Sequence, residues 1–539
     1  MRQYSNLSQA FLDAAARNRD RPALCCGGQV LTYGQLRDAA ASIAGMLVSK
    51  DLVKPGDRVA ILSERTPVLY TGVLAALLSG AAYVPLNPRF PVERNRAMLE
   101  LSEARILICD QRHQALLPDL LRGVTHKIDV VLPESAASEH HLTKADLPSD
   151  VCDDALPNGQ NREDLAYVLF TSGTTGVPKG VPISHGNVLR YLASATELSG
   201  IRPDDRIIQL VDLTFDLSVH DMFMTWLNGA ALYVVPQNAV LLGTRFVEEH
   251  AITGWLSVPS TAAFVKEAGA LSPGCMPSLR FSFFCGEALP GAVAEGWAEA
   301  APNSAIYNIY GPTEATVAFS FYRYQPGQKV PPAVVPLGRP LPEQHMGLFT
   351  PEGARCEEEL GEICLSGSQV SKGYWRAPEI SATRFFESEG RRWYRTGDLG
   401  RLDPREGYLY AGRIDRQVKI RGFRVELQEI ETVLRRAVKR DVVAVVPWSS
   451  SPDSPATGCV AFVMGPARPS NAIIAECSKA LPDYMVPRRI YFLPDFPLNA
   501  NGKVDYAALA KMQRTGPIIT EPTPPRARAL PAGKRSASK

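Results

Sequence analysis

The sequence predicts an α/β protein with a large N-terminal core of layered sheets and helices, followed by a small α+β domain. The chain has 539 residues, which is too long for one hydrophobic core and favours two or three domains. Short β-rich runs alternate with helical patterns, as in largely parallel sheets covered by helices. The pattern changes near Gly412 to Arg416. We therefore predict a core over residues 1–414, a C-terminal subdomain over 415–512 and a disordered tail over 513–539.

The N-terminal core is predicted to contain a series of short strands. They are expected at residues 57–62, 81–86, 104–109, 166–170, 231–235, 254–259 and 279–286. The strand at 166–170 leads directly into the polar stretch LFTSGTTGVPKGVPISHGNV, residues 169–188. Because ligands of such folds bind at the carboxyl ends of the strands, this stretch lies where a ligand is expected.

The polar stretch combines glycines, Ser and Thr hydroxyls and Lys179. Glycines let a backbone approach a ligand closely, and amides and hydroxyls beside a lysine commonly hold phosphate oxygens. The Walker pattern is excluded, because Pro178 stands where that pattern needs a glycine and Gly180 follows the lysine. A flexible surface turn is the alternative interpretation. The position directly after a strand favours the phosphate loop.

The C-terminal subdomain is predicted to begin with a strand, VKIRGFRV at residues 418–425, and a helix from Glu426 onward. Apolar residues recur there at helical spacing, at Leu427, Ile430, Leu434 and Val438. The remaining elements are expected to be a helix before Leu481 and strands at 441–446, 458–464 and 489–493. The tail is rich in Pro, Ala, Arg and Ser, a composition typical of disorder.

The composition argues for a small-molecule ligand. Lys plus Arg number 58 and Asp plus Glu 56, so neither nucleic acid nor an anionic membrane is an expected partner. The longest largely apolar stretch, residues 73–86, is too short to span a bilayer. The N-terminal sequence lacks the apolar core of a signal peptide, which predicts a cytoplasmic location. The ten cysteines show neither zinc spacing nor a disulfide framework, so we expect them to be reduced and mostly buried.

Ten stretches dense in glycine and polar residues follow one order along the chain. They are LTYGQL (31–36), YVPLNPRFPVERNRAML (83–99), TSGTTGVPKG (171–180), FDLSVHDMF (215–223), NIYGPTEATV (308–317), GEICLSGSQVSKGYW (361–375), YRTGDL (394–399), GRIDRQVKIRGFRVELQEIE (412–431), LPDYMVP (481–487) and NGKVD (501–505). In sequence and order this set closely resembles the adenylation domains of nonribosomal peptide synthetases and their freestanding relatives, within the ANL superfamily of adenylate-forming enzymes. The resemblance covers about Leu31 to Asp505.

The resemblance implies a reaction in which a carboxylate attacks the α-phosphorus of ATP and pyrophosphate leaves. Cations, including Mg²⁺, must offset the repulsion between the two anions. Glu314 resembles the Mg²⁺ ligand of the family, Lys503 its catalytic lysine, and Asp415 the hinge about which the small domain rotates between two half-reactions. Without the family match, a lone lysine after Asn-Gly would be a turn residue.

The same resemblance implies a nucleotide site. Tyr310 resembles the aromatic residue that stacks on adenine, and Asp398 the carboxylate that accepts the ribose hydroxyls; without the family, Asp398 could equally be a helix cap. Lys419 is a candidate for contact with the nucleotide or with an incoming pantetheine. The residues implied in ATP binding are Thr171, Ser172, Gly173, Thr174, Thr175, Gly176, Lys179, Gly286, Glu287, Ala288, Asn308, Tyr310, Gly311, Thr313, Asp398, Arg413 and Lys419.

Asp216, in FDLS, matches the aspartate that pairs with the α-ammonium group in amino-acid-specific members. The implied pocket consists of Asp216, Leu217, His220, Ser257, Phe283, Cys285, Ile309, Val317, Ala318 and Lys503. Bulky Phe283, Cys285 and Ile309 and the lack of a charge for a substrate side chain predict a small uncharged amino acid such as Pro, Ala, Ser or Thr. His220 either hydrogen-bonds a hydroxyl through Ser257 or fills space.

The resemblance also implies partners. No carrier-protein site of the Gly-Gly-x-Ser type is present, so we expect a separate peptidyl or acyl carrier protein whose phosphopantetheine thiol receives the aminoacyl group, and a monomeric enzyme. HHLTKAD, residues 140–146, superficially resembles a condensation motif, and we interpret it as a polar loop. Two alternatives remain open: an acyl-CoA ligase that delivers to free CoA, and a nucleotide-binding protein that has lost catalysis.

Overall fold

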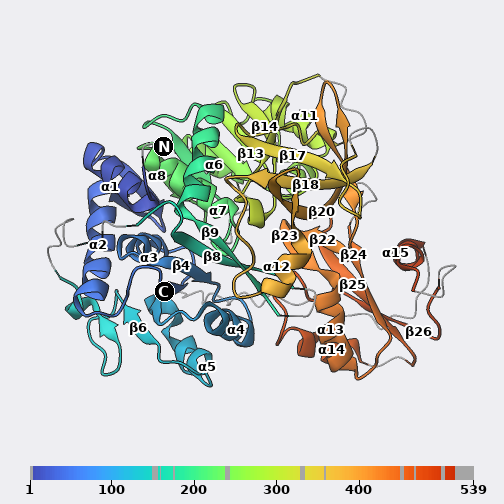
Figure 1. Cartoon of the computed structure of the whole chain (residues 1–539), viewed down its shortest axis with the longest axis horizontal. Coiled ribbons are helices and arrows are strands. Elements are labelled where there is room, and N and C mark those ends of the chain that lie inside the picture. Colours follow the sequence, from blue (N-terminus) through green and yellow to red (C-terminus); the bar gives the residue numbers. More distant parts are fainter. Residues whose placement is uncertain are drawn as a thin grey trace, which may run out of the picture.

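The part of the chain that the structure describes forms five β-sheets, which are connected and covered by helices (Figure 1). The computed structural model describes residues 4–148, 156–157, 160–173, 177–236, 243–327, 334–356, 360–449, 455–466, 469–498 and 504–515, with the side chains of 514 and 515 excepted. The predicted α/β class with layered sheets is confirmed.

The first large sheet has seven strands. In spatial order they are β7 (Leu142–Thr143), β6 (Asp129–Leu132), β5 (Ile106–Cys109), β3 (Arg58–Leu62), β4 (Ala82–Leu86), β8 (Leu165–Thr171) and β9 (Lys179–Ser184). All neighbours pair in parallel except β8 and β9. Along β3, Val59 and Ile61 enter one hydrophobic cluster while Ala60 and Leu62 enter another. Because both faces are covered, its sequence is continuously apolar instead of alternating.

The second large sheet has nine strands. In order they are β16 (Arg339–Pro340), β15 (Ser320–Tyr324), β14 (Ala305–Tyr310), β13 (Phe281–Phe284), β12 (Gly254–Ser257), β10 (Arg206–Gln209), β11 (Ala231–Val234), β1 (Pro22–Cys26) and β2 (Gln29–Thr32). The run from β14 to β1 is parallel. The carboxyl ends of these strands therefore meet at one edge, where the functional loops begin.

Helices separate and flank the two sheets. Those of the N-terminal part are α1 (Leu7–Arg17), α2 (Tyr33–Ser49), α3 (Pro67–Leu78), α4 (Val92–Ser102), α5 (Leu117–Leu121), α6 (His185–Ser199), α7 (Leu217–Val219), α8 (Thr225–Leu227), α9 (Gly243–His250), α10 (Pro259–Glu267) and α11 (Gly291–Ala300). Every residue of α3 from Val68 to Leu78 is buried. A helix that is apolar on all sides belongs between layers, and α3 joins the cluster that connects both sheets.

A third sheet and the C-terminal region follow the two large sheets in the part of the chain that the structure describes. The third sheet contains β17 (Gln344–Phe349), β18 (Gly361–Gly367), β20 (Arg391–Asp403), β19 (Phe385–Ser388) and β21 (Gly407–Arg413), with α12 (Pro378–Arg384) beside it. The C-terminal region adds the hairpin β22 (Gln417–Ile420) and β23 (Phe423–Glu426), α13 (Leu427–Val438), α14 (Ser470–Cys477), α15 (Tyr506–Thr515) and a sheet of β24 (Val443–Trp448), β25 (Gly458–Met464) and β26 (Ile490–Leu493).

The three-stranded sheet of the C-terminal region separates the hairpin from the last helix. Val443 and Val445 face the hairpin, α13 and α14, while Ala444 and Val446 face the opposite side with Leu509 of α15. Figure 1 shows the hairpin turned toward the N-terminal part and α15 on the far side. Lys419 and Arg424 of the hairpin line a cavity on the side of the N-terminal part.

One local prediction was wrong. The segment 418–425 is not one strand but two, because Arg421 and Gly422 both adopt positive φ, 52° and 83°, and close a tight hairpin. After the polar loop the chain forms β9 and then α6, which begins at His185. The predicted tail beyond residue 515 lies outside the described residues.

Candidate active site

The phosphate loop closes the hairpin formed by β8 and β9, in which Thr171 pairs with Lys179. Ser172 donates a hydrogen bond to the backbone oxygen of Arg424 at 2.7 Å and accepts one from the amide of Glu426 at 3.2 Å. Nζ of Lys179 lies 3.9 Å from the Glu426 carboxylate, and burial, with the nearby Arg424, lowers the pKa of this lysine. The loop thus faces β23. Thr174, Thr175 and Gly176 lie outside the described residues.

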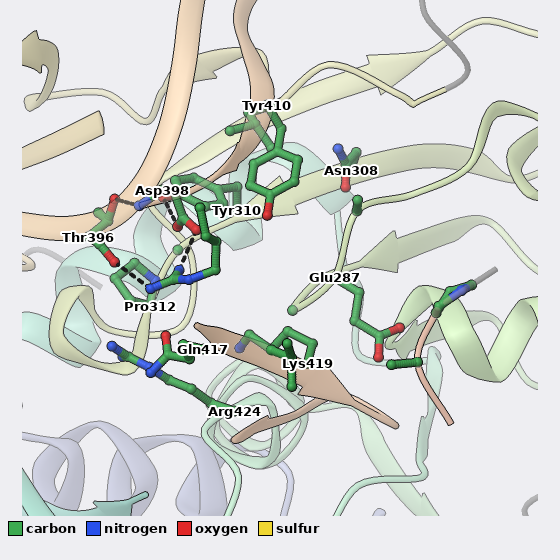
Figure 2. Close-up of a pocket in the computed structure, with 18 of the residues that line it drawn as sticks. Glu287, Asn308, Tyr310, Pro312, Thr396, Asp398, Tyr410, Gln417, Lys419 and Arg424 are labelled. Carbon is green, nitrogen blue, oxygen red and sulfur yellow. Dashed lines mark hydrogen bonds and ion pairs between the residues drawn. The ribbon is translucent and has the colours of Figure 1, made fainter. Parts of the chain in front are cut away.

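A cavity of about 520 Å³ lies between the second sheet, the third sheet and the C-terminal hairpin. Its walls include Gly286, Glu287, Ala288, Asn308, Ile309, Tyr310, Gly311, Asp398, Tyr410, Arg413, Asp415 and Lys419. Figure 2 shows Tyr310, Tyr410 and Asn308 on one side, with Lys419 and Arg424 approaching from the other. The structure therefore gathers most of the residues predicted for the nucleotide around one cavity.

Asp398 is the centre of the polar network in this cavity. It lies on β20, so it is not a helix cap, and it pairs in register with Arg413 of β21. The hydroxyl of Tyr310 donates to Asp398 at 2.6 Å, and the Arg413 guanidinium contacts the same carboxylate. Arg413 also binds Asp415, with Nε and Oδ1 2.7 Å apart, and these two carboxylates raise the pKa of the arginine despite its burial. The predicted hinge residue, Asp415, is thereby connected to the polar network of this cavity.

Hydrogen bonds to backbone groups fix the side chains of Asn308 and Glu287. The Asn308 amide group donates to the backbone oxygens of Val335 and Pro336 at 3.1 and 2.8 Å. Glu287 accepts hydrogen bonds from the amides of Ser260, at 2.8 Å, and Gly422, at 2.6 Å. The Glu287 side chain therefore fixes the tip of the C-terminal hairpin against the cavity wall.

Glu314 follows the Gly311-Pro312 turn at the end of β14 and is 1% exposed. Its carboxylate oxygens lie 2.7 and 3.0 Å from Nη1 of Arg424 and accept a hydrogen bond from Tyr374 at 2.6 Å. Burial alone would raise the pKa of Glu314, but Arg424, Tyr374 and Lys179 lower it to about 2.

These contacts decide whether Glu314 is available to a metal ion. Its oxygens already face a guanidinium, and no cluster of three potential metal ligands exists in the part of the chain that the structure describes. A carboxylate-bound Mg²⁺ needs several oxygen ligands. In this arrangement the residues around Glu314 therefore do not fit a metal ion.

A second cavity, of about 40 Å³, adjoins the first and contains Asp216. Leu217, Cys285, Val317 and Lys419 also line it. Burial raises the pKa of Asp216 to about 6, against the effects of Lys419 and of hydrogen bonds from Thr313 and Val317. A buried carboxylate of this kind favours a cationic partner, because an ammonium group would offset the cost of its desolvation.

The remaining residues of the predicted pocket lie elsewhere around this cavity. Ile309 lines the larger cavity, whereas His220, Ser257, Phe283 and Ala318 are buried and line neither. His220 accepts or donates a hydrogen bond at 2.7 Å with the Tyr191 hydroxyl, and burial lowers its pKa to about 3. Ser257 bonds instead to Trp255 and to the backbone oxygen of Val258. These hydrogen bonds of His220 and Ser257 therefore do not join the two side chains.

Lys503 lies outside the described residues. Its neighbour Val504 pairs with Leu498 and packs on the face of the three-stranded sheet that α15 covers. The residue next to the predicted catalytic lysine is therefore on the opposite face from the hairpin.

Sequence reasoning missed the residues through which the C-terminal region contacts the core. Arg424 binds Glu314, Arg94 forms a buried ion pair with Glu429 at 2.7 Å, and Phe423 packs against Phe215 with ring centroids 5.9 Å apart. The sequence contained one signal for the position of Arg424. In the hairpin, Lys419 and Arg424 are cross-strand partners, and the neighbouring cross-strand pair, Val418 and Val425, is apolar. That alternation predicts a charged face, which here meets the cavity.

Known proteins share this architecture. Residues 11–375 match the AMP-binding enzyme family. The chain is 34% identical to the L-proline--[L-prolyl-carrier protein] ligase of Streptomyces coelicolor, over 92% of this chain and 94% of that protein. It is also 34% identical to tyrocidine synthase 2 of Brevibacillus parabrevis, but spans only 13% of that protein's length. The Vibrio cholerae adenylation domain AlmE, solved with glycyl-adenosine-5'-phosphate, superposes with a TM-score of 0.86 at 34% identity, over 94% of this chain and 97% of that one.

Among the described helices, none combines the length and the apolar character that crossing a bilayer requires.

Proposed function

Because the chain belongs to the AMP-binding enzyme family, we propose that it activates a small uncharged amino acid with ATP. The products of this step are an aminoacyl-AMP and pyrophosphate. The aminoacyl group is then transferred to the phosphopantetheine thiol of a separate carrier protein. The similarity to a proline--carrier protein ligase over nearly the full length of both chains supports the second step.

Two adjoining cavities carry this proposal. The larger one has the size and polar lining for a nucleotide, and the smaller one holds a buried carboxylate that needs a cation. Both are lined by Gly286, Gly311 and Lys419. An amino acid whose ammonium group pairs with Asp216 would extend its carboxylate toward the larger cavity, where the α-phosphate must lie for attack.

The polar residues have separate tasks in the proposed reaction. Asp398 and Arg413 hold the ribose end, and Lys179 and Ser172 offset the negative charge of the departing pyrophosphate. Residues 415–512 turn about Asp415 between the two half-reactions. In the first half-reaction this rotation places Lys503 at the acyl phosphate. In the second it places the hairpin β22–β23 there.

The substrate is proposed to be small and uncharged, such as Pro, Ala, Ser or Thr. The small cavity leaves little room beside Asp216, and the part of its lining formed by Leu217, Cys285 and Val317 is apolar apart from the thiol. The relatives agree in size class, since one is named for proline and another was solved with a glycyl adenylate.

Amino-acid-dependent pyrophosphate exchange, measured over all proteinogenic amino acids, tests the reaction and the pocket together. We expect exchange with one or a few small uncharged amino acids. Product analysis with free CoA and with a holo-carrier protein then separates the proposed transfer from an acyl-CoA ligase. Preference for Asp, Lys or an aryl acid would refute the pocket assignment, and lack of exchange with any acid would refute the activity.

Replacing Lys503 with alanine is expected to lower the exchange rate by about 100-fold or more, because a preorganised charge at the reacting phosphate is lost. ATP binding, measured by calorimetry, should stay close to that of the unmodified protein, because Asp398, Arg413 and Tyr310 remain. Lys439→Ala, at an exposed lysine of the same region, is the matched control. Unchanged exchange in Lys503→Ala would remove this residue from the proposed site.

A further inference from the structure

One arginine of the C-terminal region contacts three of its elements at once. Arg416 directly follows the predicted hinge residue, Asp415. Nη2 of Arg416 donates to Oε1 of Glu431 on α13 and to the backbone oxygen of Val445 on β24, both at 2.8 Å. Its Cζ atom lies 3.4 Å from the ring centroid of Tyr506, the first residue of α15. The residue after the hinge is therefore attached to α13, β24 and α15.

The position of β24 explains how one side chain reaches both faces of the three-stranded sheet. β24 is an edge strand, with α13 packed on one of its faces and α15 on the other (Figure 1). At this edge the amide of Val445 donates to Glu431 at 3.0 Å, and its backbone oxygen accepts from Arg416. Glu431 is 3% exposed, so its carboxylate needs the opposite charge of Arg416. The ion pair thus satisfies backbone groups that a further strand would otherwise bind.

The arginines on the two sides of the hinge have different attachments. Arg413 binds Asp398 of the third sheet as well as Asp415. The partners of Arg416 named above, in contrast, all belong to the predicted C-terminal subdomain, residues 415–512. A rotation of this subdomain about Asp415 would therefore carry Arg416 and its partners together, and these contacts would persist in both arrangements.

Tyr506 connects this cluster to the chain beside the proposed catalytic lysine. It stands three positions after Lys503 in the sequence. Between them, Val504 pairs with Leu498, and the amide of Asp505 donates to the backbone oxygen of Pro497 at 2.8 Å. Tyr506 itself packs on the apolar cluster that includes Leu509 of α15. The chain that follows Lys503 is therefore fixed by contacts of its own subdomain, and Arg416 joins it to the hinge.

We propose that Arg416, Glu431 and Tyr506 form a clamp that holds the chain beside Lys503 in one orientation relative to the hinge, which makes Arg416 and Tyr506 positioning residues of adenylate formation. This role rests on the proposed function, because that function uses Lys503 in the first half-reaction. Neither Arg416 nor Tyr506 lines either cavity, so both act through Lys503. Thiol transfer, in which Lys503 has left the site, does not depend on the clamp.

The clamp needs the shape of the guanidinium as well as its charge. A planar guanidinium can donate along its edge to Glu431 and Val445 while its face lies on the ring of Tyr506. The compact ammonium group of a lysine cannot make these contacts together. We therefore expect Arg416→Lys to behave like Arg416→Met, and Tyr506→Phe, which keeps the ring, to behave like the unmodified protein.

The two half-reactions, measured separately, test the clamp. In Arg416→Met and in Tyr506→Leu, kcat for pyrophosphate exchange should fall by about tenfold or more, because misplacing a group by about 1 Å can cost about 100-fold. KM for ATP and for the amino acid should stay nearly constant, since both cavities keep their linings. Single-turnover transfer from preformed aminoacyl-AMP to a holo-carrier thiol should also persist. Unchanged kcat in both variants would overturn the proposal, and so would an equal loss of exchange and transfer.

Arg488→Met is the matched control. Arg488 belongs to the same region and also lies over an aromatic ring, with its Cζ atom 4.5 Å from the ring centroid of Trp448. It donates to the backbone oxygen of Thr457 at 2.7 Å, away from the residue that follows the hinge. This variant should keep the kcat of the unmodified protein. An equal loss of kcat would show that removal of any arginine–aromatic contact in this region suffices, which would contradict a specific clamp.

Hydrogen exchange of the full chain, read by mass spectrometry on peptides that cover residues 504–512, tests the clamp without any reaction. The amide of Leu509 donates to the backbone oxygen of Asp505 in the first turn of α15. Exchange in this turn should be faster in Arg416→Met than in the unmodified protein or in Arg488→Met. Equal protection in all three proteins would refute the clamp. Faster exchange in Arg416→Met, together with an unmodified protein that activates no amino acid, would refute the proposed function alone.

Discussion

Replacing Gly422 with leucine is expected to nearly abolish thiol transfer and to leave pyrophosphate exchange largely intact. A Cβ atom at Gly422 would lie 2.4 Å from Cγ1 of Val258, and the residue has φ of +83°. The hairpin tip would have to move away, which would break the hydrogen bond from its amide to Glu287. Exchange uses the other placement that we propose for the C-terminal region, in which the hairpin does not occupy the site.

The control for this variant separates steric overlap from backbone strain. Gly269 has φ of +71°, and no atom lies within 4 Å of the position that a Cβ atom would take there. Gly269→Leu therefore carries a similar conformational cost without a clash, and it should transfer normally. Single-turnover transfer from preformed adenylate measures the effect. A Gly422→Leu enzyme that still transfers at the normal rate would show that the docked hairpin is not needed for that step.

Replacing Asp216 with asparagine is expected to raise the KM for the amino acid by about 100-fold or more, because a buried ion pair that loses one partner costs about 3 kcal/mol. The pH dependence of KM follows from the pKa of Asp216, which is about 6. Only the ionised carboxylate pairs with an ammonium group, so lowering the pH through 6 removes the binding form. In the unmodified enzyme KM should rise by about tenfold for each pH unit below 6.

The KM for the amino acid, measured by pyrophosphate exchange between pH 5 and 8, tests both parts. In Asp216→Asn the high KM should not change across this range. Asp221 is the matched control, since it is a buried aspartate of the same segment that lines neither cavity. Asp221→Asn should keep the pH profile of the unmodified enzyme. A KM that is flat with pH in that enzyme would contradict the role of Asp216.

The layered core and the residues that line the larger cavity are largely predictable from the sequence. Strand β8 is a continuous apolar run that ends at the phosphate loop, and Tyr310 and Asp398 belong to motifs whose order is diagnostic. Each of these residues is placed by its own strand, so local pattern and motif suffice. Local pattern and motif also suffice for Asp216, which directly precedes α7 in its motif.

The contacts of the hairpin are not predictable in this way. Arg421 and Gly422 form a turn with two positive φ values, but Arg-Gly is not the usual signal for it, so the segment resembles one strand. The pairing of Arg424 with Glu314 joins residues 110 positions apart and depends on where the C-terminal region sits. His220 illustrates a further limit: its partner, Tyr191, comes from α6 and belongs to none of the motifs.

Cys285 has a consequence for the chemistry proposed beside it. An aminoacyl-AMP is a reactive mixed anhydride, and a thiolate next to it would acylate the enzyme itself. Burial, with the nearby Asp216, raises the pKa of Cys285 to about 12, and its Sγ donates a weak hydrogen bond to the backbone oxygen of Val317. Since the thiolate is the nucleophile and the thiol is not, this side chain stays inert at physiological pH. In the proposed reaction, sulfur can thus lie in the wall of the pocket while the activated aminoacyl group stays reserved for the thiol of the proposed carrier protein.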